Sequence, residues 1–273
     1  MSLETGPSRR GDVPALKALW KQAFGDGDAC IGAFFDTLYR PETVLTVRED
    51  EQVRAMVCWL PETICFGRRG WPAAYLYAVA TEESARGRGL CGRLLAYAAG
   101  FLASQGFRTL LLVPGEASLR GFYARHGYAD YTAVSLLEAE AAPGAGRLEE
   151  VSAPEYLELR EAMLAGRAYV SCPVPVLSYQ RAVARQYGGG LYRLERDGYT
   201  ALACAALDAA GRAVVYELLT PAVPRDDAAF LAHALGADRA LARTPGGETP
   251  FAMARWLAPP PDCPPPYLGI ALD

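Results

Sequence analysis

A glycine-rich segment in the first half of the chain has the residues needed to bind a phosphate group. Residues 86–92 read Arg-Gly-Arg-Gly-Leu-Cys-Gly, and they follow the apolar run AAYLYAVAT and precede a stretch with helical spacing of its leucines. The start of a helix leaves backbone N–H groups unpaired and carries partial positive charge. Glycines let a ligand approach that backbone. The segment therefore indicates a site for a phosphate or pyrophosphate.

Two common nucleotide-binding motifs do not explain this segment. A dinucleotide-binding domain opens with a strand and a glycine-rich turn and continues as βαβ units. Here the glycines come after an antiparallel hairpin that alternation predicts for residues 43–61. A Walker loop requires Gly-Lys followed by Ser or Thr, and residues 86–92 lack it.

A second segment with chemical potential lies further along the chain. Residues 122–128 read Phe-Tyr-Ala-Arg-His-Gly-Tyr and follow the apolar strand RTLLLVP. An unperturbed tyrosine has a pKa of ~10 and is protonated at neutral pH. A tyrosine hydroxyl such as that of Tyr123 can therefore donate a proton at neutral pH.

The order of the predicted elements places both segments in one fold. Over residues 10–137 we expect two helices, a hairpin, a buried strand, the glycine-led helix, a strand, a short helix and a final strand. This order, the Arg86-x-x-Gly89 loop and the segment 122–128 resemble the GCN5-related N-acetyltransferase (GNAT) superfamily. Two residues depart from the family pattern: Cys91 stands where Gly or Ala is usual, and Glu116 where many members carry asparagine.

The resemblance implies an α/β (α+β) fold and an N-acetyltransferase that moves an acetyl group from acetyl-CoA to a primary amine of a small molecule or protein by direct attack. Tyr123 would protonate the leaving thiolate. The pantetheine arm would pair with a strand backbone, and the pyrophosphate would lie on the loop N–H groups. The expected cofactor-binding residues are Val79, Ala80, Thr81, Arg86, Gly87, Arg88, Gly89, Leu90, Cys91, Gly92, Ser118 and Leu119. Two alternatives stay open: a non-catalytic acyl-CoA-binding or interaction module, and a transferase with another acyl donor.

The second half of the chain repeats the order of the first. LTVREDEQVRAMVCWL corresponds to YRLERDGYTALACAAL, RTLLLVPGE to RALARTPGGE, FYARHGY to FAMARWL, and YTAVSLL to YLGIALD. We therefore expect two GNAT-like mixed-sheet domains, residues 1–140 and 148–273, joined by the small-residue stretch AEAAPGAG. The second has no glycine-rich loop, and its Asp226 and Asp227 would repel a pyrophosphate, so we interpret it as degenerate.

Two linked copies resemble the tandem-domain enhanced intracellular survival acetyltransferases, without their sterol-carrier-like domain. In those relatives the terminal carboxylate reaches the active site, so the resemblance makes Asp273 a second candidate catalytic residue. Three glutamates near the loop in sequence are expected to be exposed: Glu62, Glu82 and Glu83. Aromatic residues of the first two helices either line an acceptor pocket or form core: Trp20, Phe24, Phe34, Phe35 and Tyr39.

Composition limits the remaining functional classes. The chain is 51% hydrophobic and 21% charged with a net charge of −4, which is typical of a folded protein and lacks the basic character of a nucleic-acid binder. No apolar run reaches the length of a membrane span, and the N-terminal residues lack an apolar signal core. Seven scattered cysteines and two histidines argue against a metal site and favour a cytoplasmic protein. Oligomeric state stays open.

Overall fold

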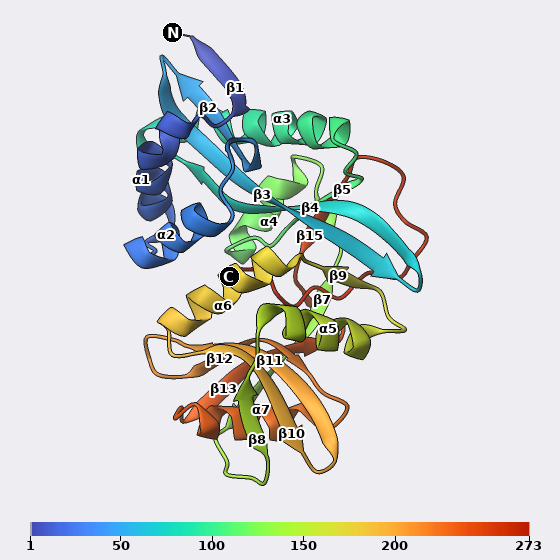
Figure 1. Cartoon of the computed structure of the whole chain (residues 1–273). Helices are drawn as coiled ribbons and strands as arrows, with labels where there is room; N and C mark the ends of the chain where they lie inside the picture. Colours follow the sequence, from blue (N-terminus) through green and yellow to red (C-terminus); the bar gives the residue numbers. More distant parts are fainter. Residues whose placement is uncertain (1, 273) are drawn as a thin grey trace. The chain divides into compact units, whose positions relative to one another are not determined.

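The computed structural model describes residues 2–272 as two compact units, and neither unit is continuous in sequence (Figure 1). Unit 1 contains the described residues up to Thr63, together with Gly70–Ala129 and Met253–Asp262. Unit 2 contains Ile64–Arg69, Asp130–Ala252 and the described residues from Cys263 onward. The units therefore do not follow the boundaries expected from the repeat.

Unit 1 is built on a mixed sheet with the strand order β1-β2-β3-β4-β5-β15-β6, in which β4 and β5 are parallel. Its strands are β1 (Leu3–Pro7), β2 (Val44–Glu49), β3 (Gln52–Phe66), β4 (Arg69–Thr81), β5 (Thr109–Leu112), β6 (Ala129–Asp130) and β15 (Met253–Trp256). Its helices are α1 (Val13–Phe24), α2 (Asp28–Thr37), α3 (Leu90–Ser104) and α4 (Arg120–Ala124). Short 3-10 turns lie at η1 (Arg10–Asp12), η2 (Pro41–Thr43), η3 (Glu83–Ala85) and η4 (Ala117–Leu119).

Unit 2 has a second mixed sheet, with the order β14-β7-β13-β12-β11-β10-β8. The strands of this sheet are β7 (Ala133–Glu140), β8 (Arg147–Glu150), β10 (Gly190–Arg196), β11 (Tyr199–Leu207), β12 (Ala213–Leu219), β13 (Arg239–Pro245) and β14 (Thr249–Pro250), and the short strand β9 (Tyr169–Ser171) lies outside it. The helices of unit 2 are α5 (Ala153–Leu164), α6 (Val174–Gln186) and α7 (Pro224–Ala234). When this sheet is followed from β8 and the first sheet from β1, the strands succeed one another in equivalent order. The parallel pair is β12 and β13. The prediction of two mixed-sheet α/β domains is confirmed.

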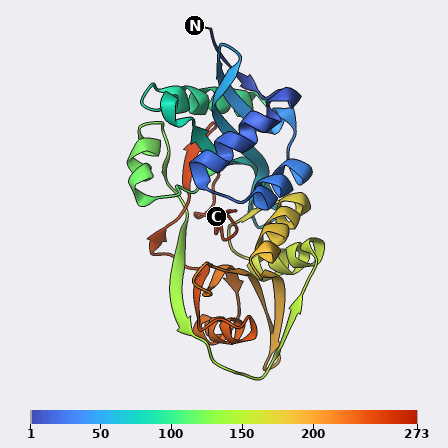
Figure 2. The same ribbon diagram turned by 90° about the vertical axis from the view of Figure 1, so that its left-hand side faces the viewer.

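The strand that completes each sheet comes from the other half of the chain. β7, expected as the last strand of the first copy, pairs antiparallel with β13 from Pro245↔Val134 to Arg239↔Glu140 (Figure 2, light green beside orange). In the other sheet β15 pairs with β5, with Met253 opposite Leu112. The two predicted correspondences at the ends of the repeat are therefore wrong. The segment FAMARWL forms a strand, whereas its expected counterpart FYARHGY contains a helix. The segment YLGIAL forms an isolated bridge between Tyr267 and Tyr169 in place of the expected strand.

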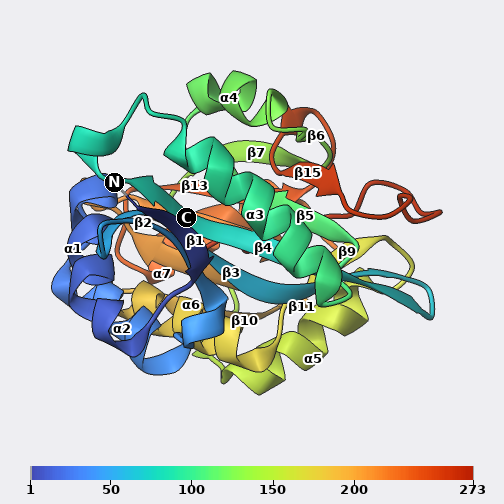
Figure 3. The ribbon, with the colours of Figure 1, turned by 90° about the horizontal axis from the view of Figure 1, so that it is seen from above.

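Alternating apolar residues give the unit 1 sheet two buried faces. Leu94, Leu95 and Ala98 of α3 pack with Leu45 and Val57 from alternate positions of β2 and β3, and α3 lies across this face (Figure 3). On the opposite side, the Trp20 ring of α1 lies 4.9 Å from Phe34 of α2 and 5.3 Å from Tyr77 of β4.

The aromatic residues of the first two helices, α1 and α2, mostly belong to the core. Trp20 and Phe34 are 1% and 0% exposed, whereas Phe24 is 47% exposed. Of the two alternatives, core and acceptor pocket, Trp20 and Phe34 therefore fit the core. Among the described residues, no helix has the length and apolar character needed to cross a bilayer.

The core of unit 2 contains a buried ion pair. Arg160 of α5 and Glu217 of β12 are 1% and 0% exposed, and the Arg160 Nε and Nη2 atoms donate to Glu217 at 2.8 and 3.1 Å. The Tyr156 hydroxyl also donates to Glu217, at 3.1 Å, and Arg160 Nη1 donates to the Val170 carbonyl at 3.0 Å. The pair is thus satisfied by hydrogen bonds on several sides, which is the condition under which buried charges are tolerated.

Arg160→Met is expected to lower the free energy of unfolding by about 3–5 kcal/mol, because it leaves Glu217 buried without a counter-charge. Adding Glu217→Leu should recover most of that loss, since both charges are then absent. The control is Arg212→Met, which breaks the solvent-accessible Arg212–Asp208 pair and should cost far less stability. Urea unfolding followed by circular dichroism measures all three. Equal losses for Arg160→Met and Arg212→Met would contradict this account.

Candidate active site in unit 1

The two parallel strands at the centre of unit 1 separate part-way along their length. Pairing between β4 and β5 runs from Ala73↔Thr109 to Tyr75↔Leu111, whereas β4 continues to Thr81. Ala78 has a φ of 50°, a left-handed conformation that costs a non-glycine residue about 1–2 kcal/mol. The distortion lies at the point where β4 has left β5. The backbone of Val79, Ala80 and Thr81 therefore has no β5 neighbour, and Val79 and Thr81 are half-buried.

The glycine-rich segment turns the chain from β4 into α3. Gly87 and Gly89 have φ values of 74° and 76°, which favour glycine, and Gly89 is the residue that precedes the helix. A Cβ atom at either position would meet no atom within 4 Å. The first helical hydrogen bond runs from Arg93 N to Gly89 O, so the N–H groups of Leu90, Cys91 and Gly92 precede it. The loop thus presents helix-start N–H groups beside open space.

The two loop arginines differ in what they contact. Arg88 forms a two-point ion pair with Glu49 of β2, with Nη1 donating to Oε2 at 3.1 Å. This guanidinium lowers the pKa of Glu49, chiefly through the hydrogen bond. Arg86 is exposed, and its Nε donates to the Thr81 carbonyl at 3.3 Å. Arg88 therefore holds the loop against β2, and Glu49 balances its charge. The sequence did not predict this ion pair, because no local pattern links residues this far apart.

Cys91 and Gly92 occupy the first turn of α3. Burial raises the pKa of the Cys91 thiol to about 11, so the thiol is neutral at physiological pH and adds no negative charge beside the helix start. A Cβ on Gly92 would lie 2.5 Å from Cε1 of His126. The ring of His126 also lies 4.8 Å from that of Phe122. Gly92 thus allows the His126 ring to pack closely against the first turn of α3.

Tyr123 of α4 joins the same buried cluster as the start of α3 and the end of β5. It is 7% exposed and shares that cluster with Leu90, Leu94 and Leu112. Its ring lies 5.8 Å from the Tyr128 ring. Burial, and to a smaller extent the neighbouring Cys91, raises the pKa of Tyr123 above its usual value. The phenol therefore keeps its proton at neutral pH and can donate it.

The other predicted residues are less closely grouped. Ser118 and Leu119 lie exposed in η4, where Ser118 Oγ donates to Glu116 at 3.0 Å. Asp273 lies outside the described residues. Glu82 forms an ion pair with Arg54 of β3.

Of the three glutamates expected to be exposed, Glu83 is exposed, Glu82 is half-buried and Glu62 is buried. Glu62 of β3 is only 6% exposed, so the expectation of an exposed carboxylate is wrong for this residue. It alternates in register with the buried apolar residues Leu60 and Ile64, and strand periodicity places it on their face of the sheet.

Unit 2 has a comparable strand separation but fills it with its own chain. Pairing between β12 and β13 ends at Val215↔Ala242. Beyond that point, Arg243 Nη1 donates to the Gly269 carbonyl at 2.7 Å, and a Cβ on Gly269 would lie 2.2 Å from Glu217 Oε1. The C-terminal segment therefore lies between the diverging strands.

An internal carboxylate lies at the start of α7. Asp227 is 0% exposed and accepts hydrogen bonds from Thr220 Oγ1, the Tyr199 hydroxyl and Arg196 Nη1 at 2.6, 2.8 and 3.1 Å. Its neighbour Asp226 is exposed. The helix start that corresponds to the glycine-led end of α3 is thus occupied by the protein's own negative charge.

Comparisons with known proteins agree with this geometry. Residues 5–130 match the family model described as an acetyltransferase (GNAT) domain. A search of curated protein sequences found no match. Among solved structures, a GCN5-related N-acetyltransferase from Anabaena variabilis superposes with a TM-score of 0.72 at 15% identity, covering 94% of this chain and 73% of that one.

Two further solved structures share the two-unit fold. A GCN5-related N-acetyltransferase from Kribbella flavida has a TM-score of 0.70 at 17% identity, covering 94% of this chain and 72% of its own. Eis1 from Mycobacterium abscessus has a TM-score of 0.65 at 15% identity, covering 94% and 74%. The family match confirms the predicted GNAT superfamily for residues 5–130, and the solved structures, Eis1 among them, show that the chain shares their two-unit fold.

Proposed function

We propose that unit 1 binds acetyl-CoA and transfers its acetyl group to a primary amine by direct attack. The observation that carries this proposal is the convergence of three features in one unit: the gap between β4 and β5, the open helix start at Gly89, and the buried phenol of Tyr123. A linear thioester with a pyrophosphate end has chemistry that fits all three.

Each part of the donor has a proposed contact. The N–H groups from Gly87 to Gly92 receive the pyrophosphate, with Arg86 adding positive charge from an exposed position. The amides of the pantetheine arm pair with the unpaired edge of β4 at Val79, Ala80 and Thr81, as an added strand would. Leu90, Cys91 and Gly92 contribute through their backbone, and Ser118 and Leu119 flank the arm from η4.

The proposed reaction needs one proton donor and one proton acceptor. The amine nitrogen attacks the thioester carbonyl, a C–N bond forms, and the C–S bond breaks. Tyr123 gives its proton to the departing thiolate sulfur and the amine loses one proton. Asp273 is the proposed carboxylate that receives it, on the resemblance to the tandem-domain relatives. The acceptor is an amine of a small molecule or protein, and we place the reaction in the cytoplasm.

Calorimetric titration with acetyl-CoA is expected to give one site per chain. Within residues 2–272, a glycine-led helix start occurs in unit 1 alone, while in unit 2 Asp227 and the segment at Gly269 occupy the corresponding places. Two equivalent sites would contradict the degenerate interpretation of unit 2.

The titration is paired with a thiol-release assay over amines, polyamines, aminoglycosides and peptides. One site with turnover on any of these supports the proposal. One site with no turnover on any of them favours the binding-module alternative. Turnover with longer acyl-CoAs only would identify a different donor.

A further inference from the structure

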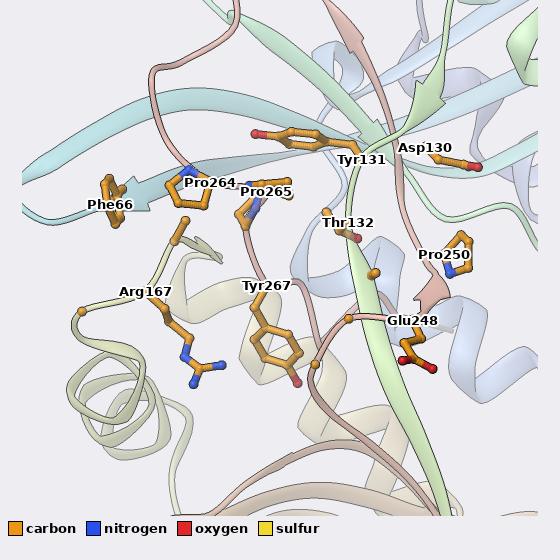
Figure 4. A pocket seen from close by; sticks show the side chains of 16 residues that line it. Phe66, Asp130, Tyr131, Thr132, Arg167, Glu248, Pro250, Pro264, Pro265 and Tyr267 are labelled. Atoms are coloured by element: carbon orange, nitrogen blue, oxygen red, sulfur yellow. The ribbon is translucent and has the colours of Figure 1, made fainter.

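Unit 2 contains a cavity of about 760 Å³, and every residue that lines it belongs to this unit. Ligand pockets for small molecules commonly measure ~300–1,000 Å³. Figure 4 shows an apolar upper wall made by Phe66, Tyr131, Pro264 and Pro265, with the ring of Tyr267 below it. The cavity is thus large enough for a small organic molecule with an apolar middle.

The walls of the cavity are held by main-chain hydrogen bonds. Tyr267 N donates to Ala168 O at 2.8 Å, and Val170 N donates back to Tyr267 O at 2.8 Å. On the other side, Phe251 N donates to Thr132 O at 2.8 Å. Proline rings add little conformational freedom to the upper wall. The cavity therefore needs little ordering when a ligand enters it, which favours binding.

Three charged residues from different segments line the cavity, one guanidinium and two carboxylates: Arg167, Glu248 and Asp130. Arg167 extends from the loop between α5 and β9, and Glu248 from the loop between β13 and β14, with the Tyr267 ring between them (Figure 4). The side chains of Arg167 and Glu248 are exposed, and within residues 2–272 neither forms an ion pair or side-chain hydrogen bond. A guanidinium can donate two parallel hydrogen bonds to a carboxylate, and a carboxylate can accept hydrogen bonds from an ammonium group.

We propose that this cavity binds a zwitterion of the amino-acid or short-peptide class. The ligand's carboxylate lies on Arg167, its ammonium group lies on Glu248, and its apolar middle packs on Phe66, Tyr131 and the prolines. Because Arg167 and Glu248 do not pair with each other, a ligand that carries both charges satisfies both at once. This inference does not depend on acyl transfer in unit 1.

Calorimetry of the full chain without acetyl-CoA tests the proposal. The probes are three forms of the tripeptide Ala-Phe-Ala: one with both ends charged, one with an acetylated amine and one with an amidated carboxyl. The doubly charged form is expected to bind at millimolar concentration or below. Each blocked form is expected to bind at least about tenfold more weakly, since it loses one charge-assisted hydrogen bond.

Two variants assign the ends of the ligand. Arg167→Gln should abolish the difference between the charged and amidated forms, and Glu248→Gln the difference between the charged and acetylated forms. Matched controls are Arg239→Gln and Glu158→Gln, which remove exposed charges of the same unit outside the cavity and should leave all three affinities unchanged. Equal affinity for the three peptides, or no binding of the charged form, would overturn the proposal. Neither result bears on acetyl-CoA binding, which is measured separately.

Discussion

Replacing Tyr123 with phenylalanine is expected to lower kcat by roughly 10²–10⁴-fold, with a far smaller change in the affinity for acetyl-CoA. The substitution removes one oxygen from a ring that is 7% exposed and leaves its packing partners unchanged. Without the hydroxyl, the thiolate leaves without a positioned proton donor. Steady-state kinetics and calorimetry with acetyl-CoA together measure the two effects.

The pH dependence adds a second readout. Burial raises the pKa of Tyr123 above its usual ~10, so the phenol stays protonated through the whole neutral range. A group that donates its proton loses this ability only when the pH rises through its pKa. We therefore expect no fall in rate from Tyr123 below about pH 10. A decline on the acid side reports protonation of the attacking amine or of the group that accepts its proton.

Tyr128→Phe is the matched control for this experiment. Tyr128 lies in the same cluster, is 3% exposed, and its hydroxyl has no hydrogen-bond partner among the described residues. Loss of this hydroxyl should leave kcat within a few-fold of the original protein. An effect of Tyr123→Phe on affinity alone would assign the hydroxyl to cofactor anchoring. No effect on either quantity would remove Tyr123 from the mechanism and favour the binding-module alternative.

Gly89→Leu should weaken acetyl-CoA binding by roughly 100-fold or more while the fold persists. A leucine at this position places a side chain in the open space beside the helix start and blocks the N–H groups proposed to hold the pyrophosphate. Loss of two charge-assisted hydrogen bonds accounts for a change of this size. Calorimetry measures the affinity, and circular dichroism checks that secondary structure is kept.

Gly106→Leu separates blocked binding from backbone strain. Gly106 follows the other end of α3 and has a φ of 88°, and a Cβ atom there would meet no atom within 4 Å, as is true of Gly89. Both substitutions place a leucine in the left-handed region and should cost about 1–2 kcal/mol of stability. Only the change at Gly89 should affect affinity. If both variants bind acetyl-CoA equally well, the glycine-led loop is not the pyrophosphate site.

The local features of this protein could be predicted from the sequence. The glycine spacing at 86–92 and the segment 122–128 are short motifs whose backbone requirements act within a few residues. Strands and helices followed from periods of two and 3.6 residues, which reflect only the backbone geometry of each element. The internal repeat then predicted two sheets with the same strand order, because both halves of the chain have the same succession of strands and helices.

The tertiary structure alone decided which segments complete each sheet and how the site is fastened. A strand such as β7 or β15 has the same alternation whichever sheet it joins, and only the partners available in space choose between β5 and β13. The pairing of Arg88 with Glu49, and the packing of His126 against Gly92, likewise join residues that no local pattern connects. Sequence patterns report the conformation of neighbouring residues, whereas these contacts depend on how distant segments pack, and packing decides the surroundings of each reactive group.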